Sequence, residues 1–226
     1  MSQKKFYRTL LATATAAAIV TSTVIPAASI EAAPYQASAE TRLATYLFTD
    51  VSKKYEDAVQ FVYEKGILGF STTRFGVEEM ITRVDAAVML AKVLELDVEN
   101  AKPSGFKDVP SRGVKYVNAL KEAGITSGKS KTEFGSYSNI TRGELAMWIQ
   151  KAYDLKGEGQ ISFLDVSSKY KEAVTALVKN GITQGVNSKE FGTNNPAKRG
   201  DYAIFLYRAN ALTPELKETK RYFISF

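Results

Sequence analysis

Three arginines recur in the chain at nearly constant spacing, and each is followed two positions later by an acidic residue. They are Arg83, Arg142 and Arg199, which lie 59 and 57 residues apart. The sequence around each predicts the start of a helix, where the helix dipole disfavours a positive side chain. An arginine beside free backbone amides at a helix N-terminus is, however, a good receptor for a carboxylate or phosphate. The pattern therefore predicts binding of an anionic group.

Helix capping is the simpler interpretation of the same residues. Thr141 and Glu144 have the spacing of a capping box, in which each side chain accepts a hydrogen bond from the backbone amide of the other residue. Thr82 opens a weaker version that ends in an Asp. The third copy has Lys198 in place of the Thr but keeps Arg199, which favours a task for the arginine beyond capping.

The composition of the chain excludes most catalytic chemistry. The sequence contains no Cys and no His, which rules out disulfides, Ser-His-Asp triads, Cys-His pairs and the usual zinc sites. Only carboxylate, Lys or Tyr chemistry remains for an enzyme, and each repeated acid has a capping explanation. We therefore expect no catalytic residue, no metal and no cofactor.

The N-terminal segment has the pattern of a secretory signal peptide. Lys4, Lys5 and Arg8 precede an apolar run at 10–25, whose 16 residues fall short of the roughly 20 needed to span a bilayer. We expect cleavage at about 27–33, and no membrane span in the mature chain. Loss of the three basic residues lowers the net charge from +6 to near +3, which is too mild a charge to predict nucleic-acid binding.

A repeated unit must position the three arginines. The pattern Phe-x-Asp-Val opens three copies, at Phe48, Phe106 and Phe163, which are 58 and 57 residues apart. In each copy a Tyr then begins an i, i+3, i+4, i+7 apolar pattern, which predicts an amphipathic helix. A Gly-Ile pair ends each of these helices in the manner of a Schellman motif. The glycines are Gly66, Gly124 and Gly181.

A second helix is predicted after each arginine. Its apolar residues cover a wide stripe, so the second helices should be more buried than the first ones. A single unit of about 57 residues is marginal as an independent core, whereas three stacked units can share one. We therefore expect one mainly α-helical body from about 48 to 212, with Tyr55, Tyr116 and Tyr170 on the apolar stripes of the first helices.

The order of these motifs resembles the S-layer homology domain. Phe-x-Asp-Val, aromatic-x-x-Ala, Gly-Ile-x-x-Gly, a loop with Phe and Ile-Thr-Arg-x-Glu together cover about 165 residues. The resemblance implies a mainly α fold in which three tandem helix-loop-helix repeats pack as one pseudo-threefold helical bundle. It also implies non-covalent attachment to a secondary cell-wall polysaccharide, through a pyruvate ketal whose carboxylate suits the arginines.

The resemblance also divides the chain and assigns roles to residues. The expected parts are a signal peptide (1–33), a lead segment (34–47), three repeats (48–105, 106–162 and 163–212) and a C-terminal tail (213–226). The residues expected to bind the polysaccharide are Arg83, Arg142, Arg199, Gly128, Gly185, Asp50, Asp108 and Asp165. Capping at the sites is assigned to Thr82, Thr141 and Glu144, and capping of the first helix is the alternative for the three Asp residues. Tyr55, Tyr116 and Tyr170 stand where the family has Trp, and they either stack on a sugar or pack in the core.

Two repeats depart from the family pattern. Repeat 1 reads GILGF, so that Phe70 stands where the family has Gly and a glycine moves to Gly69. Repeat 3 lacks the Thr before Arg199, and Asn195-Pro196 offers an alternative helix start. Because the family's sites lie in grooves between adjacent repeats, we expect three unequal sites.

These observations predict a secreted, non-enzymatic anchor in the cell wall or S-layer of a Gram-positive bacterium. The expected partners are the pyruvylated secondary cell-wall polysaccharide, peptidoglycan-linked glycan and other S-layer proteins, without nucleic acid. Two alternatives stay open. One is a wall-associated hydrolase with two catalytic carboxylates, and the other is a helical scaffold that binds a protein partner.

Overall fold

The computed structural model describes residues 47–213, all of which belong to one unit of the chain. The predicted signal peptide lies outside the described residues, as do the predicted lead segment before Leu47 and the tail after Thr213. Each repeat contributes a first and a second helix. The first helices are α2 (Glu56–Glu64), α4 (Val114–Glu122), preceded by the 3-10 helix η2 (Ser111–Gly113), and α6 (Ser168–Lys179); the second helices are α3 (Arg83–Val93), α5 (Arg142–Ala152) and α7 (Arg199–Asn210).

The first helices end as the Gly-Ile pairs predict. Gly66, Gly124 and Gly181 have φ angles of 74°, 73° and 72°, the left-handed conformation that favours glycine. In the first repeat the amide of Ile67 donates to the carbonyl of Val62 at 3.0 Å, and the other two repeats form the equivalent bond. The predicted Schellman endings are therefore confirmed.

The two sets of helices differ in how much of their surface is buried. The first helices bury one face, whereas the second helices are buried on nearly all sides, from the initial arginine onward. Tyr55 is buried in the core, and Tyr116 and Tyr170 pack against it from partly buried positions. These contacts favour the core-packing interpretation of the tyrosines over sugar stacking.

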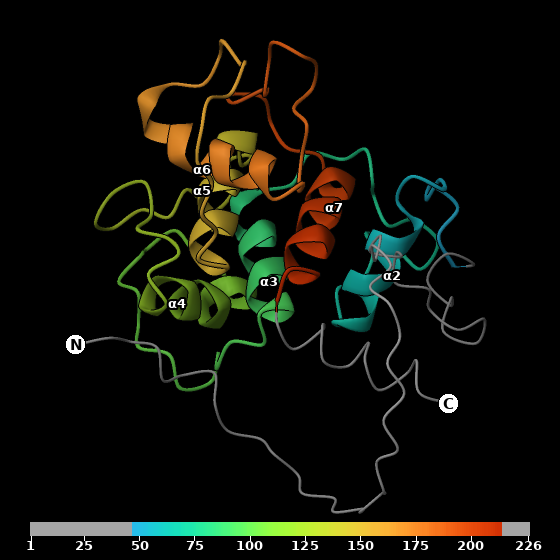
Figure 1. The fold of residues 1–226 in the computed structure, drawn as a ribbon. Helices are drawn as coiled ribbons and strands as arrows, with labels where there is room; N and C mark the ends of the chain where they lie inside the picture. Colours follow the sequence, from blue (N-terminus) through green and yellow to red (C-terminus); the bar gives the residue numbers. More distant parts are fainter. Residues whose placement is uncertain (1–46, 214–226) are drawn as a thin grey trace, which may run out of the picture. The chain divides into compact units, whose positions relative to one another are not determined.

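Helices pair mainly between repeats rather than within them. The most extensive helix contacts join α3 to α4, α5 to α6 and α7 to α2, and Figure 1 shows α3, α5 and α7 together with the first helices placed around them. Because α2 of the first repeat packs on α7 of the last, the arrangement closes on itself. The predicted fold class, mainly α with three tandem repeats in one bundle, is confirmed.

A ring of three backbone hydrogen bonds joins the segments that precede the second helices. The amide of Ile81 donates to the carbonyl of Ala197 at 3.0 Å, that of Ala197 to Ile140 at 2.9 Å, and that of Ile140 to Ile81 at 3.1 Å. Each repeat therefore gives one bond and receives one. Between residues 47 and 213 the β-structure is limited to three isolated bridges, which lie in these segments.

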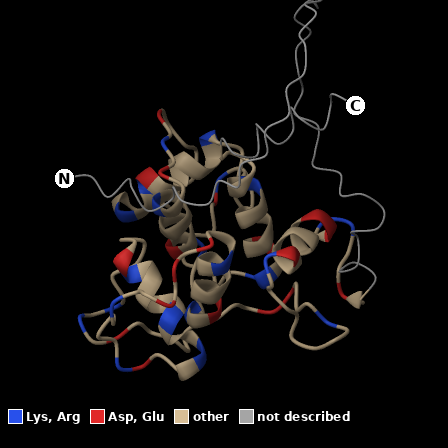
Figure 2. Ribbon diagram, turned by 90° about the horizontal axis from the view of Figure 1, so that it is seen from below, with Lys and Arg blue, Asp and Glu red and all other residues tan. Residues whose placement is uncertain are grey.

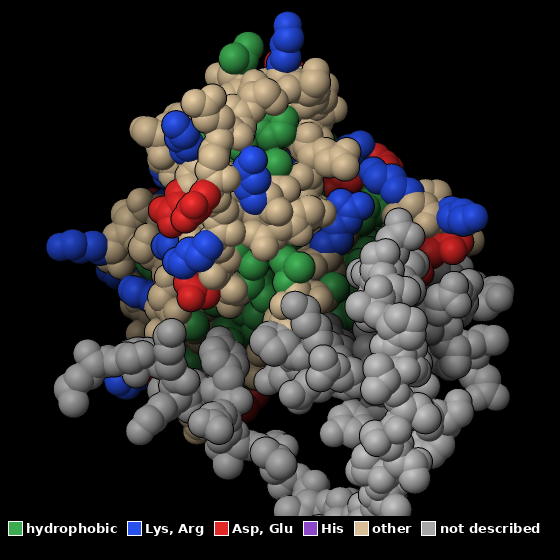
Figure 3. Space-filling view, in the orientation of Figure 1, with side chains coloured by type: hydrophobic (Ala, Val, Ile, Leu, Met, Phe, Trp, Pro, Cys, Tyr) green, Lys and Arg blue, Asp and Glu red, His purple; other side chains and the backbone are tan. Residues whose placement is uncertain are grey.

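The surface carries charges of both signs. Lys and Arg alternate with Asp and Glu along the helices and loops in Figure 2, and the face in Figure 3 mixes both signs with small apolar groups. On the face drawn in Figure 3, the described residues form no concentrated basic stripe of the kind that nucleic-acid binding uses. No helix in the described part of the chain has both the length and the apolar composition to cross a membrane.

Candidate ligand-binding grooves

The three arginines lie at the contacts between consecutive repeats, each as the first residue of a second helix. Their backbone amides donate to the loop of the next repeat: Arg83 to Ser138 at 2.9 Å, Arg142 to Asn195 at 3.0 Å, and Arg199 to Glu79 at 2.8 Å. The arginines are only 3%, 7% and 8% exposed. Each arginine is therefore buried between two repeats, and is not a solvated side chain that merely follows a helix cap.

In the groove at Arg83, the guanidinium is held on several sides. Its Nε donates to the carbonyl of Phe134 at 2.9 Å, and its central carbon lies 5.0 Å from the ring centre of Phe134 and 5.1 Å from that of Trp148. Nη1 lies 3.1 Å from a carboxylate oxygen of Glu144. The protein itself thus supplies a carboxylate to this arginine.

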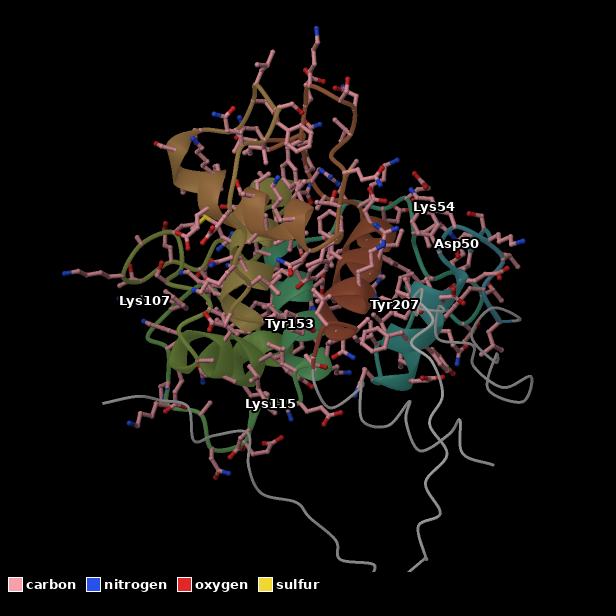
Figure 4. The ribbon with its side chains drawn as sticks, in the orientation of Figure 1. Asp50, Lys54, Lys107, Lys115, Tyr153 and Tyr207 are labelled. Carbon is pink, nitrogen blue, oxygen red and sulfur yellow. The ribbon has the colours of Figure 1, made fainter. Side chains whose placement is uncertain are left out.

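The groove at Arg142 repeats this arrangement with a weaker ion pair. Nε donates to the carbonyl of Phe191 at 3.0 Å, and the guanidinium lies between the rings of Phe191 and Phe205, 5.1 and 5.2 Å from their centres. Asp201 is 3.8 Å from Nη1, and its carboxylate also accepts a hydrogen bond from Lys54 at 3.2 Å. Figure 4 labels Lys54 beside Asp50, on the segment that leads to α2.

The groove at Arg199 differs from the other two. Here Nη2 donates to the carbonyl of Leu68 at 2.7 Å, and the buried Nε has no hydrogen-bond partner among the described residues. The guanidinium lies 4.7 Å from the ring centre of Phe75 and 5.5 Å from that of Phe70. Asp85, which has the position of Glu144, forms no ion pair with Arg199 within residues 47–213 and acts on it only through its charge.

Burial is the main influence on the charge of all three arginines. It lowers their pKa values, and the nearby carboxylates act in the opposite direction: Glu144 on Arg83, Asp201 on Arg142 and Asp85 on Arg199. A guanidinium still remains protonated at neutral pH. Each groove therefore contains a buried positive charge, which is costly unless a hydrogen-bonded anion accompanies it.

Glu144 combines capping with neutralisation of Arg83. Its carboxylate accepts from the amide of Thr141 at 3.2 Å while the Thr141 hydroxyl accepts from the amide of Glu144 at 3.3 Å, which forms the capping box. Lys129 also donates to Glu144. Burial acts to raise the pKa of Glu144, but the contacts with Lys129, Arg83 and Thr141 outweigh it, so the pKa lies below its ordinary value. Thr82 accepts from the amide of Asp85 in the same capping position.

The three repeated Asp residues hold the loops rather than the first helices. Asp108 accepts three hydrogen bonds, from the amides of Phe134 and Gly135 at 2.7 Å and from that of Ser136 at 2.9 Å. Asp50 and Asp165 bind the equivalent loops of their repeats. Burial acts to raise the pKa of these carboxyls, but the amides hold the pKa below its ordinary value.

The helix-capping alternative for these Asp residues is therefore wrong. The N-cap residues of the first helices, Tyr55, Gly113 and Ser167, make no side-chain capping bond. The alternative start at Asn195-Pro196 for the second helix of repeat 3 is also wrong, because α7 begins at Arg199 with Lys198 as its N-cap. Asn195 and Pro196 instead precede it, where Pro196 forms an isolated bridge with Thr141.

Gly128 and Gly185 occupy tight turns with φ angles of 77° and 83°. A Cβ at Gly128 would overlap the ring of Phe106 and lie 2.7 Å from the carbonyl oxygen of Glu133, and Gly185 has equivalent neighbours. These contacts lie within one repeat, so packing alone requires glycine at both positions.

In repeat 1, Gly69 takes the place of these glycines. A Cβ at Gly69 would overlap the carbonyl oxygen of Arg74 and lie 2.6 Å from the ring of Phe48, the counterpart of Phe106. The loop is therefore one residue shorter, and the interpretation of Phe70 as a replacement for Gly is wrong. Phe70 instead packs over Gly76, as Lys129 does over Gly135 in the groove at Arg83.

The shorter loop forms one wall of a pocket of about 240 Å³. Leu68 and Phe70 line one side and are 68% and 63% exposed. Met89 of α3 lines the other side, and Arg199 lies at the pocket together with Lys92. Met89 has the helix position that Trp148 and Phe205 have in the other grooves, which leaves more room beside the guanidinium.

Several of these residues escaped prediction from the sequence. Trp148, Lys129 and Lys92 lie in grooves without belonging to the repeated motif. A comparison of the second helices position by position would have found Trp148 and Lys92, whereas Lys129 lies in the loop before α5. Gly69 would have been found by counting backwards from the Phe-Gly pair instead of forwards from Gly-Ile. The part of the chain that the structure describes contains no group of three or more acidic side chains that could hold a metal.

Comparison with known proteins identifies the repeats. Residues 47–87, 105–146 and 162–203 match the S-layer homology domain, SLH. These three stretches cover more than half of the chain and contain the three arginines.

Full-length relatives share the same region. The chain is 32% identical to the surface-layer 125 kDa protein of Lysinibacillus sphaericus over 92% of its own length and 17% of that protein. It is 31% identical to an S-layer protein of Bacillus licheniformis, over 91% and 23% of the two chains. An endoglucanase of Bacillus sp. (strain KSM-635) is 31% identical over 59% of this chain and 14% of its own. The chain thus spans less than a quarter of each relative.

Proposed function

Because the chain belongs to the S-layer homology domain family, we propose that it attaches non-covalently to the bacterial cell wall by binding an acidic wall polysaccharide. The observation that carries this proposal is the set of three guanidinium groups at the contacts between repeats. Each is fixed by a loop carbonyl and lies beside aromatic rings. Such preorganised cations suit a carboxylate attached to a sugar, because little side-chain freedom is lost on binding.

The ligand proposed in more detail is a secondary cell-wall polysaccharide with a pyruvate ketal. Arg83, Arg142 and Arg199 would bind its carboxylate, and Gly128 and Gly185 would keep the adjacent loops close to the sugar. Asp50, Asp108 and Asp165 act through the loops, since their carboxylates are occupied by backbone amides. The chain would then reside, after export, in the cell wall or S-layer of a Gram-positive bacterium, beside other S-layer proteins.

Binding is favoured over hydrolysis by the state of the acidic residues. A glycoside hydrolase needs two carboxylates that face a substrate. The repeated acids of this chain instead hold loops, cap helices or neutralise an arginine. The endoglucanase among the relatives matches this chain over only 14% of its length, which is consistent with a shared attachment region joined to another domain.

Co-sedimentation with purified Gram-positive wall sacculi tests the proposed function. Intact sacculi are compared with sacculi stripped of secondary polysaccharide and with sacculi that lack its pyruvate. We expect binding to intact sacculi only, weakened by Arg142→Ala, which removes one of the three guanidinium groups. Lys151→Ala, an exposed change in the last turn of the same helix, is the control and should bind as the wild type does. Equal binding to stripped sacculi, or none to intact ones, would overturn the proposal.

A further inference from the structure

The three grooves differ in whether an internal carboxylate already accompanies the arginine. Arg83 has a close ion pair with Glu144 at 3.1 Å, and Glu144 is itself largely buried, with 12% of its side chain exposed. Arg142 has a longer contact with Asp201 at 3.8 Å. Arg199 has no ion pair with any described residue, although Asp85 of α3 has the position in this groove that Glu144 of α5 has in the groove at Arg83. The grooves therefore form a series of decreasing internal neutralisation.

Two neighbours hold the Asp85 carboxylate away from Arg199. One oxygen accepts a hydrogen bond from the hydroxyl of Thr82 at 2.6 Å, and the other accepts from Nη1 of Arg112. Arg112 lies in η2, between the Phe-x-Asp-Val motif and the Tyr of the second repeat. This stretch is three residues longer in the second repeat than in the first and third. The extra residues thus bring a competing cation to Asp85.

The pocket beside Arg199 has the features of a ligand site. Arg199 is more than nine-tenths buried and its Nε lacks a partner within residues 47–213. Leu68 and Phe70 are exposed at the pocket. Lys92 adds a second positive charge to the lining, and Asp85 adds a carboxylate that Thr82 and Arg112 bind. A small anion with an apolar group next to its charge matches this combination, because each part of it meets a suitable surface.

We propose that the groove at Arg199 is the primary anion-binding site of the chain and that Arg112 keeps it open by holding Asp85 aside. The ligand is a carboxylate that carries an apolar substituent, with the carboxylate on Arg199 and the substituent against Leu68 and Phe70. This proposal rests on the proposed function and ranks its three sites. Arg112 is a positioning residue, since it acts through Asp85.

An external carboxylate meets a different situation at Arg83. It would have to displace Glu144, which also binds Lys129 and the amide of Thr141. Displacement would separate the largely buried Glu144 carboxylate from Arg83 and leave Lys129 as its remaining cation, which is unfavourable. The groove at Arg83 should therefore bind the same ligand more weakly than the groove at Arg199.

Affinity measurements on exposed variants test the role of Arg112. The probe is the pyruvylated polysaccharide released from sacculi, titrated into the full protein. Arg112→Ala should weaken binding five- to tenfold, because Asp85 is then free to pair with Arg199. Arg112→Lys should retain most of the affinity, and Asp85→Asn added to Arg112→Ala should restore it. Lys115→Ala on α4 (Figure 4), which breaks a similarly exposed pair with Glu99, is the matched control and should change affinity less than twofold.

Pyruvate alone is a second probe, which does not depend on the polysaccharide. Titrated into ¹⁵N-labelled protein, it should shift the Nε–H resonance of Arg199 at lower concentration than those of Arg83 and Arg142. A first response at Arg83, or no response at any of the three, overturns the ranking even if sacculi are bound. Unchanged affinity of Arg112→Ala for the polysaccharide overturns the role of Arg112. Failure of the wild type to bind polysaccharide while Arg199 responds to pyruvate would instead count against the proposed function alone.

Discussion

The groove at Arg83 and the groove at Arg199 are built from the same elements of successive repeats but stabilise a buried charge differently. At Arg83 the protein provides a carbonyl, two rings and the carboxylate of Glu144. At Arg199 it provides a carbonyl and rings only, and the equivalent carboxylate of Asp85 is bound elsewhere. One sequence motif can therefore serve mainly to fasten two repeats together in one copy and to receive an external anion in another.

Removal of the guanidinium group of Arg83 or of Arg199, one at a time, should distinguish most strongly between fastening two repeats together and receiving an external anion. Arg83→Met is expected to lower the free energy of unfolding by about 3 kcal/mol, the lower end of the range for a broken buried pair, because the largely buried Glu144 loses one of its two cations and keeps only Lys129. Arg199→Met should cost only about 1 kcal/mol, since no carboxylate is abandoned and a long apolar side chain replaces the arginine. Urea denaturation at neutral pH measures both values. Equal losses would mean that Asp85 neutralises Arg199 after all.

The two loops can be compared through their glycines. Gly69→Ala should lower the free energy of unfolding by about 2–3 kcal/mol, because the new Cβ overlaps the carbonyl of Arg74 and the ring of Phe48. Gly128→Ala should cost at least as much, since its φ of 77° adds strain. Phe70→Ala is the control and should change stability little, because its side chain is mostly exposed. Thermal unfolding of the three variants gives the order, and a neutral Gly69→Ala would restore Phe70 as the counterpart of Gly128.

The pH dependence of the free energy of unfolding should reveal the contribution of Glu144, the carboxylate that pairs with Arg83. The pKa of Glu144 is lowered in the folded protein from an ordinary value of 4.5. Its ionised form therefore stabilises the fold above about pH 4.5, and this contribution is lost as the pH falls through the lower folded pKa. Glu144→Gln should be less stable than the wild type by about 1–2 kcal/mol at pH 7.

Urea denaturation of both proteins from pH 7 to pH 3 checks this expectation. The two stabilities should converge toward pH 3, while the contributions of Asp50, Asp108 and Asp165 are common to both proteins and cancel in the difference. A difference that stays constant down to pH 3 would show that the charge of Glu144 contributes nothing to the stability of this groove.

Local patterns in the sequence predict the helices and the arginines well. Periodic apolar residues and the Gly-Ile endings depend on residues a few positions apart, and the helices and their Schellman endings formed as expected. The burial of Arg83, the loop contacts of Asp108 and the pairing of Arg112 with Asp85 join residues that are 26 to 51 positions apart. No short-range pattern contains such contacts, so the sequence offered capping of the first helix as the alternative role of the Asp residues, which is wrong, and Arg112 passed unnoticed.

The ring formed by Ile81, Ile140 and Ala197 fixes the number of repeats. In an open solenoid, copies can be added at either end, and the terminal copies need special polar faces. Here each copy donates one backbone bond to a neighbour and accepts one from the other, so no copy is terminal. A deleted or duplicated copy would leave the triangle unable to close with the same geometry. The backbone hydrogen bonds thus restrict the arrangement to three repeats. All three grooves should therefore form, or be lost, in a single cooperative step.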